Sequence, residues 1–280
     1  MLGCALVPAL RAAGHDVVAH GHLRSADVRA DLTDAGAAAA LVGRLRPAVV
    51  VNLVALADVD VCEIEPQRAD LLNVRVVENL VGAIGRSAAG ARLVHVSTDQ
   101  VYGGPGPHVE ADARAANAYA SSKLAGEAAA GRIGAAVLRT NFYGRSACAG
   151  RPSFTDWLHE ALTERRAIRV FEDVLFNPMA IDALADVIAL VVARQPAGVF
   201  NVGAAGGMSK ADFAFAFAAA AGLPVDTMAR STSDTMATYR AFRPKDMRMD
   251  CRRLEQALGL TLPGLAPEIE RIGRGYRAPA

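Results

Sequence analysis

Over the first half of the chain, short apolar runs rich in β-branched residues alternate with longer stretches whose apolar residues recur at helical spacing. The runs predict four strands, at residues 16–19, 48–55, 91–97 and 135–138. The stretches predict four helices, at residues 4–13, 35–46, 68–87 and 116–132. Runs such as Val49-Val50-Val51 are apolar at every position, which is typical of parallel strands buried on both faces. The alternation therefore predicts an α/β fold with a doubly wound parallel sheet.

The regular alternation ends at Gly144, and a polar loop follows at residues 145–153. Beyond the loop the pattern predicts three helices and two short strands, namely helices 154–165, 181–194 and 210–221 and strands 168–171 and 199–202. We therefore divide the chain into a Rossmann-type domain at residues 1–144 and a smaller, interleaved region at residues 145–280 that is expected mainly to bind substrate. Some segments of the smaller region are expected to return to the sheet.

Composition narrows the class of protein. The formal net charge is +1 with both signs interspersed, which argues against nucleic acid or an anionic membrane as the main partner. No apolar run has the length of a membrane-spanning helix and no leader pattern is present, so we expect a cytoplasmic protein. Cys4, Cys62, Cys148 and Cys251 are scattered, which predicts inert buried thiols in a reducing compartment. The histidines show no metal-ligand spacing, and we expect no metal.

Tyr119 and Lys123 are the first candidates for catalysis. Four residues apart on a predicted helix, they project from the same face. A cation beside a phenol lowers the pKa of the phenol, so the pair predicts a tyrosine that acts as an acid near neutral pH. Lysine is rare here, since Lys123, Lys210 and Lys245 are the only ones among 30 basic residues. The alternative interpretation is an ordinary exposed pair on a helix.

A second candidate, Ser97-Thr98-Asp99, directly follows the strand predicted at residues 91–97. Its side chains are expected at the carboxyl edge of the sheet, where ligands of open α/β sheets bind. The alternative interpretation is a turn or a helix cap, which is the commoner role of such a sequence.

Together, these motifs resemble the extended short-chain dehydrogenase/reductases of the sugar-nucleotide branch, and among them the dTDP-4-dehydrorhamnose reductase family. The resemblance extends over nearly the whole chain and depends on the shared order of several motifs. These are Arg46-Pro47 to Asn52, Glu65-Pro66 with Leu72-Asn73, His95 to Tyr102, Tyr119 to Glu127, Leu138 to Asn141, and Arg243-Pro244 with Arg248 to Asp250.

The resemblance implies NAD(P)H-dependent reduction of a nucleotide-diphospho-4-keto-6-deoxysugar, a reaction of polysaccharide biosynthesis. Tyr119 would protonate the developing alkoxide, Thr98 would hold the carbonyl oxygen, and Lys123 would hold the nicotinamide ribose. The implied cofactor-binding residues in the sheet are Asn52, Ala55 and Thr140. The implied substrate-binding residues beside the catalytic threonine are Asp99 and Tyr102. The resemblance also allows a homodimer.

Several charged residues bear on the choice of ligand. The strand predicted at residues 16–19, which corresponds to the second strand of the family pattern, runs into Arg24 with no carboxylate, and this favours NADP, with NAD as the alternative. The resemblance places Asp31 and Leu32 near the adenine. Arg243 and Arg248 are suited to the substrate diphosphate, because guanidinium groups bind phosphate oxygens in a bidentate manner.

The chain departs from the family pattern at Gly3, which would be the last glycine of the pyrophosphate-binding turn. The strand and glycines that come before it in the pattern are not in the sequence. Three explanations remain open: a start at an internal Met, a loss of dinucleotide binding, or another segment in that place. Two further functions therefore remain alternatives. One is a non-catalytic regulatory subunit like the β subunit of methionine adenosyltransferase, and the other is a sugar-nucleotide epimerase or dehydratase.

Overall fold

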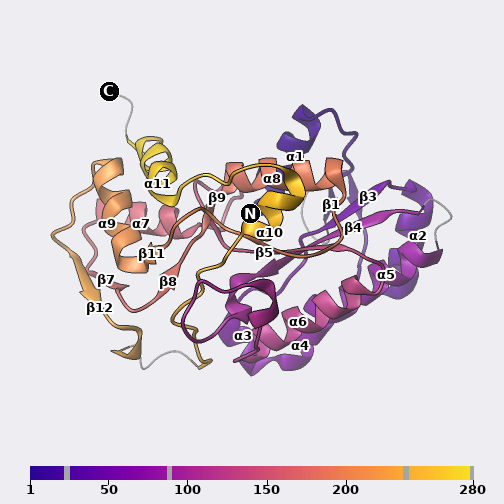
Figure 1. The fold of residues 1–280 in the computed structure, drawn as a ribbon, viewed down its shortest axis with the longest axis horizontal. Coiled ribbons are helices and arrows are strands. Elements are labelled where there is room, and N and C mark those ends of the chain that lie inside the picture. The colour runs from indigo at the N-terminus through magenta and orange to yellow at the C-terminus, as the bar shows by residue number, and fades with distance from the viewer. Residues whose placement is uncertain (22–25, 87–89, 236–239, 278–280) are drawn as a thin grey trace.

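The computed structural model describes residues 1–21, 26–86, 90–235 and 240–277. Its main sheet has four parallel strands in the order β10-β5-β4-β3 (Figure 1). They are β3 (Val49–Asn52), β4 (Arg92–Thr98), β5 (Ala136–Thr140) and β10 (Gly198–Val202). The register pairs Thr98 with Thr140, so both threonines lie at the carboxyl ends of adjacent strands. The expected α/β fold with a parallel sheet is confirmed.

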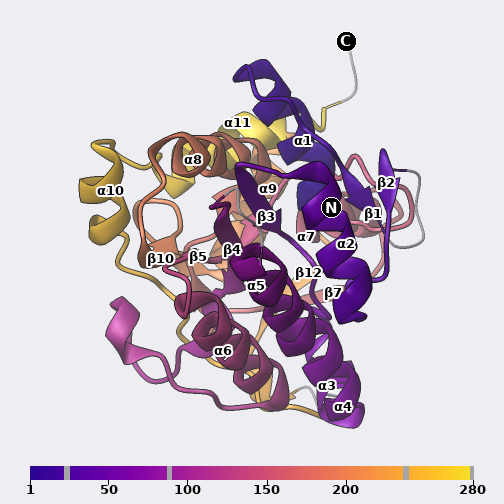
Figure 2. The same cartoon turned by 90° about the vertical axis from the view of Figure 1, so that its right-hand side faces the viewer.

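Helices cover both faces of this sheet (Figure 2). On one face, α2 (Ala35–Leu45) packs against α5 (Val76–Arg86), which in turn packs against α6 (Ala118–Gly131). On the other face, α1 (Leu2–Ala12) packs against α8 (Ile181–Arg194), which also contacts α10 (Arg252–Leu258). Each set of helices buries its own apolar cluster against the strands.

The strand predicted at residues 16–19 is misplaced. The structure has β1 at His20–Gly21, and β1 pairs in parallel with β2 (Val28–Arg29) in a separate two-stranded sheet. β3 is an end strand of the main sheet, and its three valines are only partly buried. Within the described ranges, no strand joins β1 to β3, so backbone groups on that edge of β3 have no strand partner.

The elements after Gly144 gather mainly at one end of the molecule (Figure 1). They include α7 (Phe154–Thr163), α9 (Lys210–Ala221) and α11 (Leu265–Arg274). Three short strand pairs accompany them: β6 (Phe142–Tyr143) with β9 (Met179–Ala180), β7 (Ile168–Phe171) with β12 (Met228–Ser231), and β8 (Leu175–Phe176) with β11 (Met208–Ser209). In contrast, α8 and β10 lie with the main sheet, so the two regions interleave.

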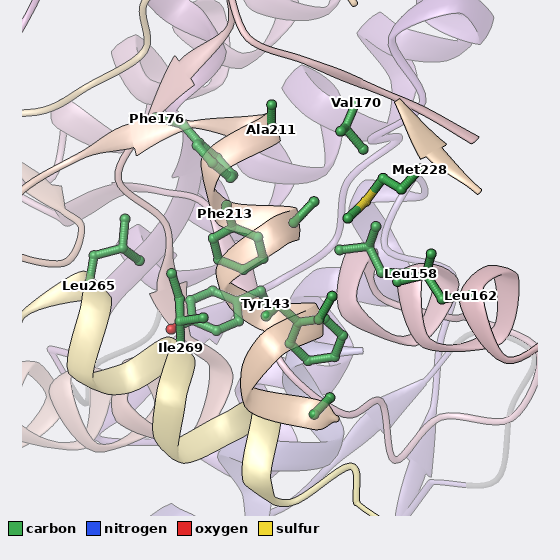
Figure 3. Close-up of a cluster of buried hydrophobic side chains, with 14 of the residues drawn as sticks. Tyr143, Leu158, Leu162, Val170, Phe176, Ala211, Phe213, Met228, Leu265 and Ile269 are labelled. Atoms are coloured by element: carbon green, nitrogen blue, oxygen red, sulfur yellow. The ribbon is translucent and has the colours of Figure 1, made fainter. Parts of the chain in front are cut away.

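The smaller region has an aromatic core of its own (Figure 3). Phe213 on α9 meets the rings of Tyr143 and Phe176 at centroid distances of 4.8 and 5.4 Å. Leu158 of α7 and Ile269 of α11 belong to the same cluster, in which nearly all side chain surface is buried. The short strands form too few backbone hydrogen bonds to be stable on their own, and burial against this core can hold them in place.

Two cysteines overturn the expectation of four inert thiols. Cys4 and Cys148 form a disulfide with a Cα–Cα distance of 6.4 Å, across 144 residues of sequence. Cys62 and Cys251 are free. Burial, the largest cause, raises the pKa of Cys62 to about 11 and that of Cys251 to about 12, which makes both weak nucleophiles. The expectation of chemically inert thiols therefore applies only to Cys62 and Cys251.

A close approach and a buried ion pair set the position of α6. The helix packs against η1 (Leu71–Arg75), and a Cβ added at Gly126 would lie 2.3 Å from the Asn73 carbonyl oxygen. The next residue, Glu127, accepts hydrogen bonds from Arg139 of β5 at 3.0 and 2.7 Å. Their side chains are only 5% and 6% exposed. Glu127 also accepts a hydrogen bond from Ser97 of β4, so it joins α6 to two central strands.

Among the described residues, no helix combines the length and apolarity needed to span a bilayer. The remaining helical segments are short and lie in the connections. They are α3 (Val59–Ile64), α4 (Pro66–Asp70), η2 (Asp99–Val101), η3 (Glu110–Asp112) and η4 (Ser233–Thr235).

Substitution of Glu127 by Gln tests the importance of this ion pair for folding. We expect Glu127→Gln to lower the free energy of unfolding by about 3–5 kcal/mol, because it leaves the buried Arg139 cation without its counter-ion. Urea unfolding followed by circular dichroism measures the change. The control is Glu270→Gln, which breaks the exposed pair with Arg274 and should leave the unfolding midpoint near that of wild type. Equal midpoints for the two variants would contradict a structural role of Glu127.

Candidate active site

Thr98 and Tyr119 meet at the carboxyl edge of the sheet. Thr98 is the last residue of β4, and Tyr119 lies in the first turn of α6. That turn is fixed by its N-cap, since Asn117 accepts a hydrogen bond from the Ala120 amide and donates one to the Phe242 carbonyl. A hydrogen bond with Thr98 acts on the Tyr119 phenol, so the two hydroxyls are neighbours.

Lys123 lies one turn along the same helix, and its side chain is almost wholly buried. Its ammonium donates a hydrogen bond of 2.8 Å to the Val96 carbonyl of β4. Burial lowers the pKa of Lys123 to about 8, although nearby Glu127 opposes this. Thr98, Tyr119 and Lys123 thus converge on the end of one strand.

The structure corrects the expected pKa of Tyr119. Burial raises this pKa to about 12, which outweighs the hydrogen bond with Thr98, and Asp99 raises it further. The expectation was a pKa lowered by Lys123. This expectation is wrong because burial disfavours the charged forms of both Tyr119 and Lys123. In addition, the Lys123 ammonium donates its hydrogen bond to the Val96 carbonyl.

Asp99 lies beside these groups as a buried carboxylic acid. Burial raises its pKa to about 6, against the opposing effects of a hydrogen bond from Asn141 and the charge of Lys210. The Asn141 amide donates to Asp99 at 2.8 Å. A buried carboxyl with a pKa near neutrality is a frequent feature of functional sites.

Sequence reasoning gave no role to Lys210. It is the first residue of α9, and its partly buried ammonium lies 6.0 Å from the centroid of the Phe176 ring. Burial lowers its pKa, Asp99 raises it, and Arg243 lowers it, so the charges of both residues act on Lys210. The ammonium makes no hydrogen bond to the part of the chain that the structure describes. The rarity of lysine in the sequence was the signal that pointed to it.

The residues expected to line a dinucleotide lie along the carboxyl ends of the strands. Asn52 ends β3 but is committed to the fold, with hydrogen bonds to His95 and the Val54 amide. Thr140 ends β5 and is buried, whereas Ala55 is exposed after β3. Gly3 lies in the first turn of α1, and a Cβ there would be 3.5 Å from Leu53, so this turn lies beside the end of β3.

Of the residues expected near the adenine, Asp31 is exposed and Leu32 is buried. Asp31 is exposed and accepts two hydrogen bonds from Thr33, at 2.9 and 2.6 Å. The Leu32 side chain packs in the core against α2 and α5, so it is not available to a ligand. Arg24, expected at a 2′-phosphate, lies outside the described residues.

Tyr102 is not a substrate contact. Its side chain is 0% exposed, and its hydroxyl donates to Asn201 at 2.5 Å and accepts from Arg139 at 2.9 Å. The ring also stacks on His108 at 4.9 Å. Every polar and apolar face of Tyr102 is therefore occupied by the protein, and the expectation of substrate binding is wrong.

The two arginines expected at the diphosphate lie in different surroundings. Arg243 donates to Asp60 at 2.8 Å and faces Lys210. Arg248 makes two hydrogen bonds to Asp246, at 2.9 and 2.7 Å, and lines a cavity of about 350 Å³ whose lining includes no catalytic candidate. Arg243 is thus the arginine whose charge acts on Lys210.

The site suits a dinucleotide at two points. Lys123 uses one of its three N–H groups on Val96, which leaves donors for a ribose. The first turn of α1 contains no acidic residue, so its amides suit an anionic pyrophosphate. The described residues include no group of three or more His, Cys, Asp or Glu side chains arranged for a metal ion.

Comparisons with known proteins identify the family of the chain. A family model described as RmlD substrate binding domain matches residues 1–276. The dTDP-4-dehydrorhamnose reductase of Escherichia coli (strain K12) is 31% identical over 265 residues, which cover 89% of this chain and 87% of that protein. Methionine adenosyltransferase 2 subunit beta of Xenopus tropicalis is 29% identical and covers 89% of this chain, with 72% of its own length matched.

Among solved structures, the dTDP-4-dehydrorhamnose reductase of Bacillus anthracis in complex with NADP aligns with a TM-score of 0.79 at 25% identity. The alignment covers 87% of this chain and 86% of that one. Family model, sequence and structure therefore agree, and the chain belongs to the RmlD substrate binding domain family, together with the dTDP-4-dehydrorhamnose reductases.

Proposed function

We propose that the protein is an NADP-dependent reductase of a nucleotide-diphospho-4-keto-6-deoxysugar, with Thr98, Tyr119 and Lys123 as its catalytic residues. The convergence of these three side chains at the carboxyl end of β4 is the observation that carries the proposal. The bound cofactor supplies a hydride to the keto carbon of the sugar. The sequence similarity to reductases supports the proposed reaction, and the structural similarity to a reductase solved with NADP supports the proposed cofactor.

Tyr119 delivers the proton. A phenol with a pKa of about 12 keeps its proton at neutral pH, and an alkoxide is a stronger base than a phenolate. Transfer from the Tyr119 hydroxyl to the sugar oxygen is therefore favourable once negative charge develops there. Thr98 is placed to donate a hydrogen bond to the same oxygen, which orients the carbonyl and stabilises its charge.

Lys123 compensates for the charge left on Tyr119. With a pKa of about 8, its ammonium remains mostly charged at neutral pH despite its burial. A cation one helical turn from the phenolate stabilises it through a medium of low dielectric constant. Its remaining N–H groups can hold the hydroxyls of the nicotinamide ribose.

Lys210 and Arg243 bind the diphosphate of the substrate in this proposal. The charge of Arg243 acts on Lys210, and two cations near one another are favoured when an anion lies between them. The smaller region, at residues 145–280, supplies both residues, which agrees with its proposed role in substrate binding.

A regulatory subunit is a second candidate function. It is favoured by the kinship with methionine adenosyltransferase 2 subunit beta and by the separation of β1 from β3, beside the proposed cofactor site. Such a protein would bind its partner enzyme and would not consume NADPH in the presence of keto sugars.

Replacement of Tyr119 by Phe removes the proton donor. We expect Tyr119→Phe to lower kcat by about 100- to 10,000-fold with dTDP-4-dehydrorhamnose and NADPH, because only the proton transfer is lost. NADPH oxidation at 340 nm measures the rate, and calorimetry should give an unchanged Kd for NADPH. Wild-type turnover in this variant would eliminate Tyr119 as the acid.

Replacement of Lys210 tests the diphosphate site. Lys210→Met should raise KM for the sugar nucleotide by about 10- to 100-fold, because a charge-assisted hydrogen bond is lost, whereas the Kd for NADPH should stay constant. Lys210→Arg should recover part of the loss. The matched control is Lys245→Met, at an exposed lysine paired with Asp173 and Asp234. An effect equally large at Lys245 would mean that net charge, rather than the site, determines KM.

Asp99 makes stability depend on pH. Its folded-state pKa of about 6 exceeds the ordinary value of 3.8, so its contribution is fully present below pH 3.8 and is lost as pH rises through 6. The Asp99→Asn variant has no carboxyl group to ionise, so its stability does not fall in this way as pH rises. Relative to wild type, we expect the variant to gain about 2–3 kcal/mol of unfolding free energy between pH 4 and pH 8.

Asp173 provides the control for this pH dependence. Its burial is outweighed by hydrogen bonds from Ser233, and its pKa is lowered. Its contribution to stability is therefore present above pH 3.8 and is lost only below that pH, so Asp173→Asn should show almost no change relative to wild type between pH 4 and pH 8. Denaturant unfolding at both pH values measures the two effects, and an equal gain in both variants would refute the assignment of Asp99.

A further inference from the structure

The Cys4–Cys148 disulfide joins the two regions of the molecule. Cys4 lies in the first turn of α1, in the larger region, and is exposed. Cys148 is partly buried in the loop that follows β6, at the start of the smaller region. The bond thus crosses from one region to the other.

The first turn of α1 is the part of the larger region that suits an anion. Cys4 is adjacent to Gly3, which lies beside Leu53 at the carboxyl end of β3. The first amides of a helix have no partner within it, and the helix dipole adds positive potential there; in α1 the Cys4 amide already donates to the Met1 carbonyl at 3.1 Å, and the amides before it lead the turn. A group bonded to Cys4 therefore lies where a pyrophosphate would approach these amides.

The loop that carries Cys148 is fastened at both ends to the smaller region. The amides of Ser146 and Ser153 both donate to Asp156 of α7, at 3.0 and 2.8 Å. Arg145 donates to the Gly275 carbonyl and lies over the Tyr276 ring. Because the loop is fixed at its base, the disulfide holds its middle against α1.

We propose that the Cys4–Cys148 disulfide is a redox modification site that holds the 145–153 loop across the N-terminal turn of α1 and weakens dinucleotide binding until a dithiol reduces it. This inference rests on the proposed function, since it concerns the cofactor of that reaction. Reduction frees the middle of the loop from α1 while its anchors on Asp156 remain.

The reaction is thiol–disulfide exchange with a dithiol reductant. A reductant thiolate attacks the sulfur of exposed Cys4, the S–S bond breaks, and the Cys148 thiolate leaves and takes up a proton. The second thiol of the reductant then displaces Cys4 from the mixed disulfide, and Cys4 takes up a proton as well. The protein gains two electrons and two protons, and the reductant becomes a disulfide.

The remaining cysteines are poor competitors in this exchange. Burial raises the pKa values of Cys62 and Cys251, so neither forms a thiolate readily near neutral pH. The exchange is therefore confined to the one pair, and thiol counting before and after reduction reports on that pair alone.

The test compares NADPH binding by the full chain in its oxidised and reduced states. Mass spectrometry after alkylation first establishes the state of the disulfide, and calorimetry then gives the Kd for NADPH with and without dithiothreitol. We expect the oxidised protein to bind about tenfold or more weakly, as loss of one charge-assisted hydrogen bond to phosphate would cause. Cys4→Ser and Cys148→Ser should bind like reduced wild type under both conditions.

Cys251→Ser is the matched control, because it removes a free cysteine and should retain the full response to dithiothreitol. Equal or tighter NADPH binding by the oxidised protein overturns the inference and leaves the proposed reductase function standing. Absence of binding in every state, including both serine variants, overturns the reductase function together with the inference. A response to dithiothreitol that persists in Cys4→Ser also overturns it, since the effect would then come from elsewhere.

Discussion

The geometry of the site depends on the ion pair between Arg139 and Glu127. Arg139 projects from β5 and Glu127 from α6, and both are nearly excluded from water. Without each other they would each carry a large desolvation penalty, so α6 is constrained to the one position that satisfies both. Tyr119 and Lys123 lie on the same helix, and the distance of each from Thr98 follows from that position. The ion pair is therefore a structural condition of the chemistry, although neither partner touches the proposed substrate.

The same network explains why Tyr102 was misassigned. Tyr102 follows Thr98 closely in sequence, and a hydroxyl near a catalytic residue is a reasonable candidate for substrate binding. In the fold, however, Arg139 and Asn201 use the Tyr102 hydroxyl to complete the buried polar network. Sequence spacing indicates which residues lie near a strand end, but burial decides whether their polar atoms face a ligand or the interior.

Local patterns predicted most of the fold because most of its signals are local. The helices predicted at residues 181–194 and 210–221 agree with α8 and α9, whose runs of helix-favouring apolar residues lie within the segments themselves. Strand 16–19 was misplaced because a two-residue strand such as β1 leaves no periodicity to detect. The Cys4–Cys148 bond was missed because its partners are 144 residues apart and only the tertiary fold brings them together.

The position of α1 shows how these long-range features act together. Its apolar side, with Leu2, Leu6 and Leu10, packs into the cluster shared with α8. The described strands on either side of it, β1 and β3, belong to separate sheets, so strand pairing does not fix the N-terminal turn of α1. The disulfide at Cys4 supplies a constraint at that turn, from the opposite region of the molecule. The end of α1 that faces the proposed cofactor site is thus held by a bond that a reductant can break, whereas its remaining length is held by packing that a reductant leaves unchanged.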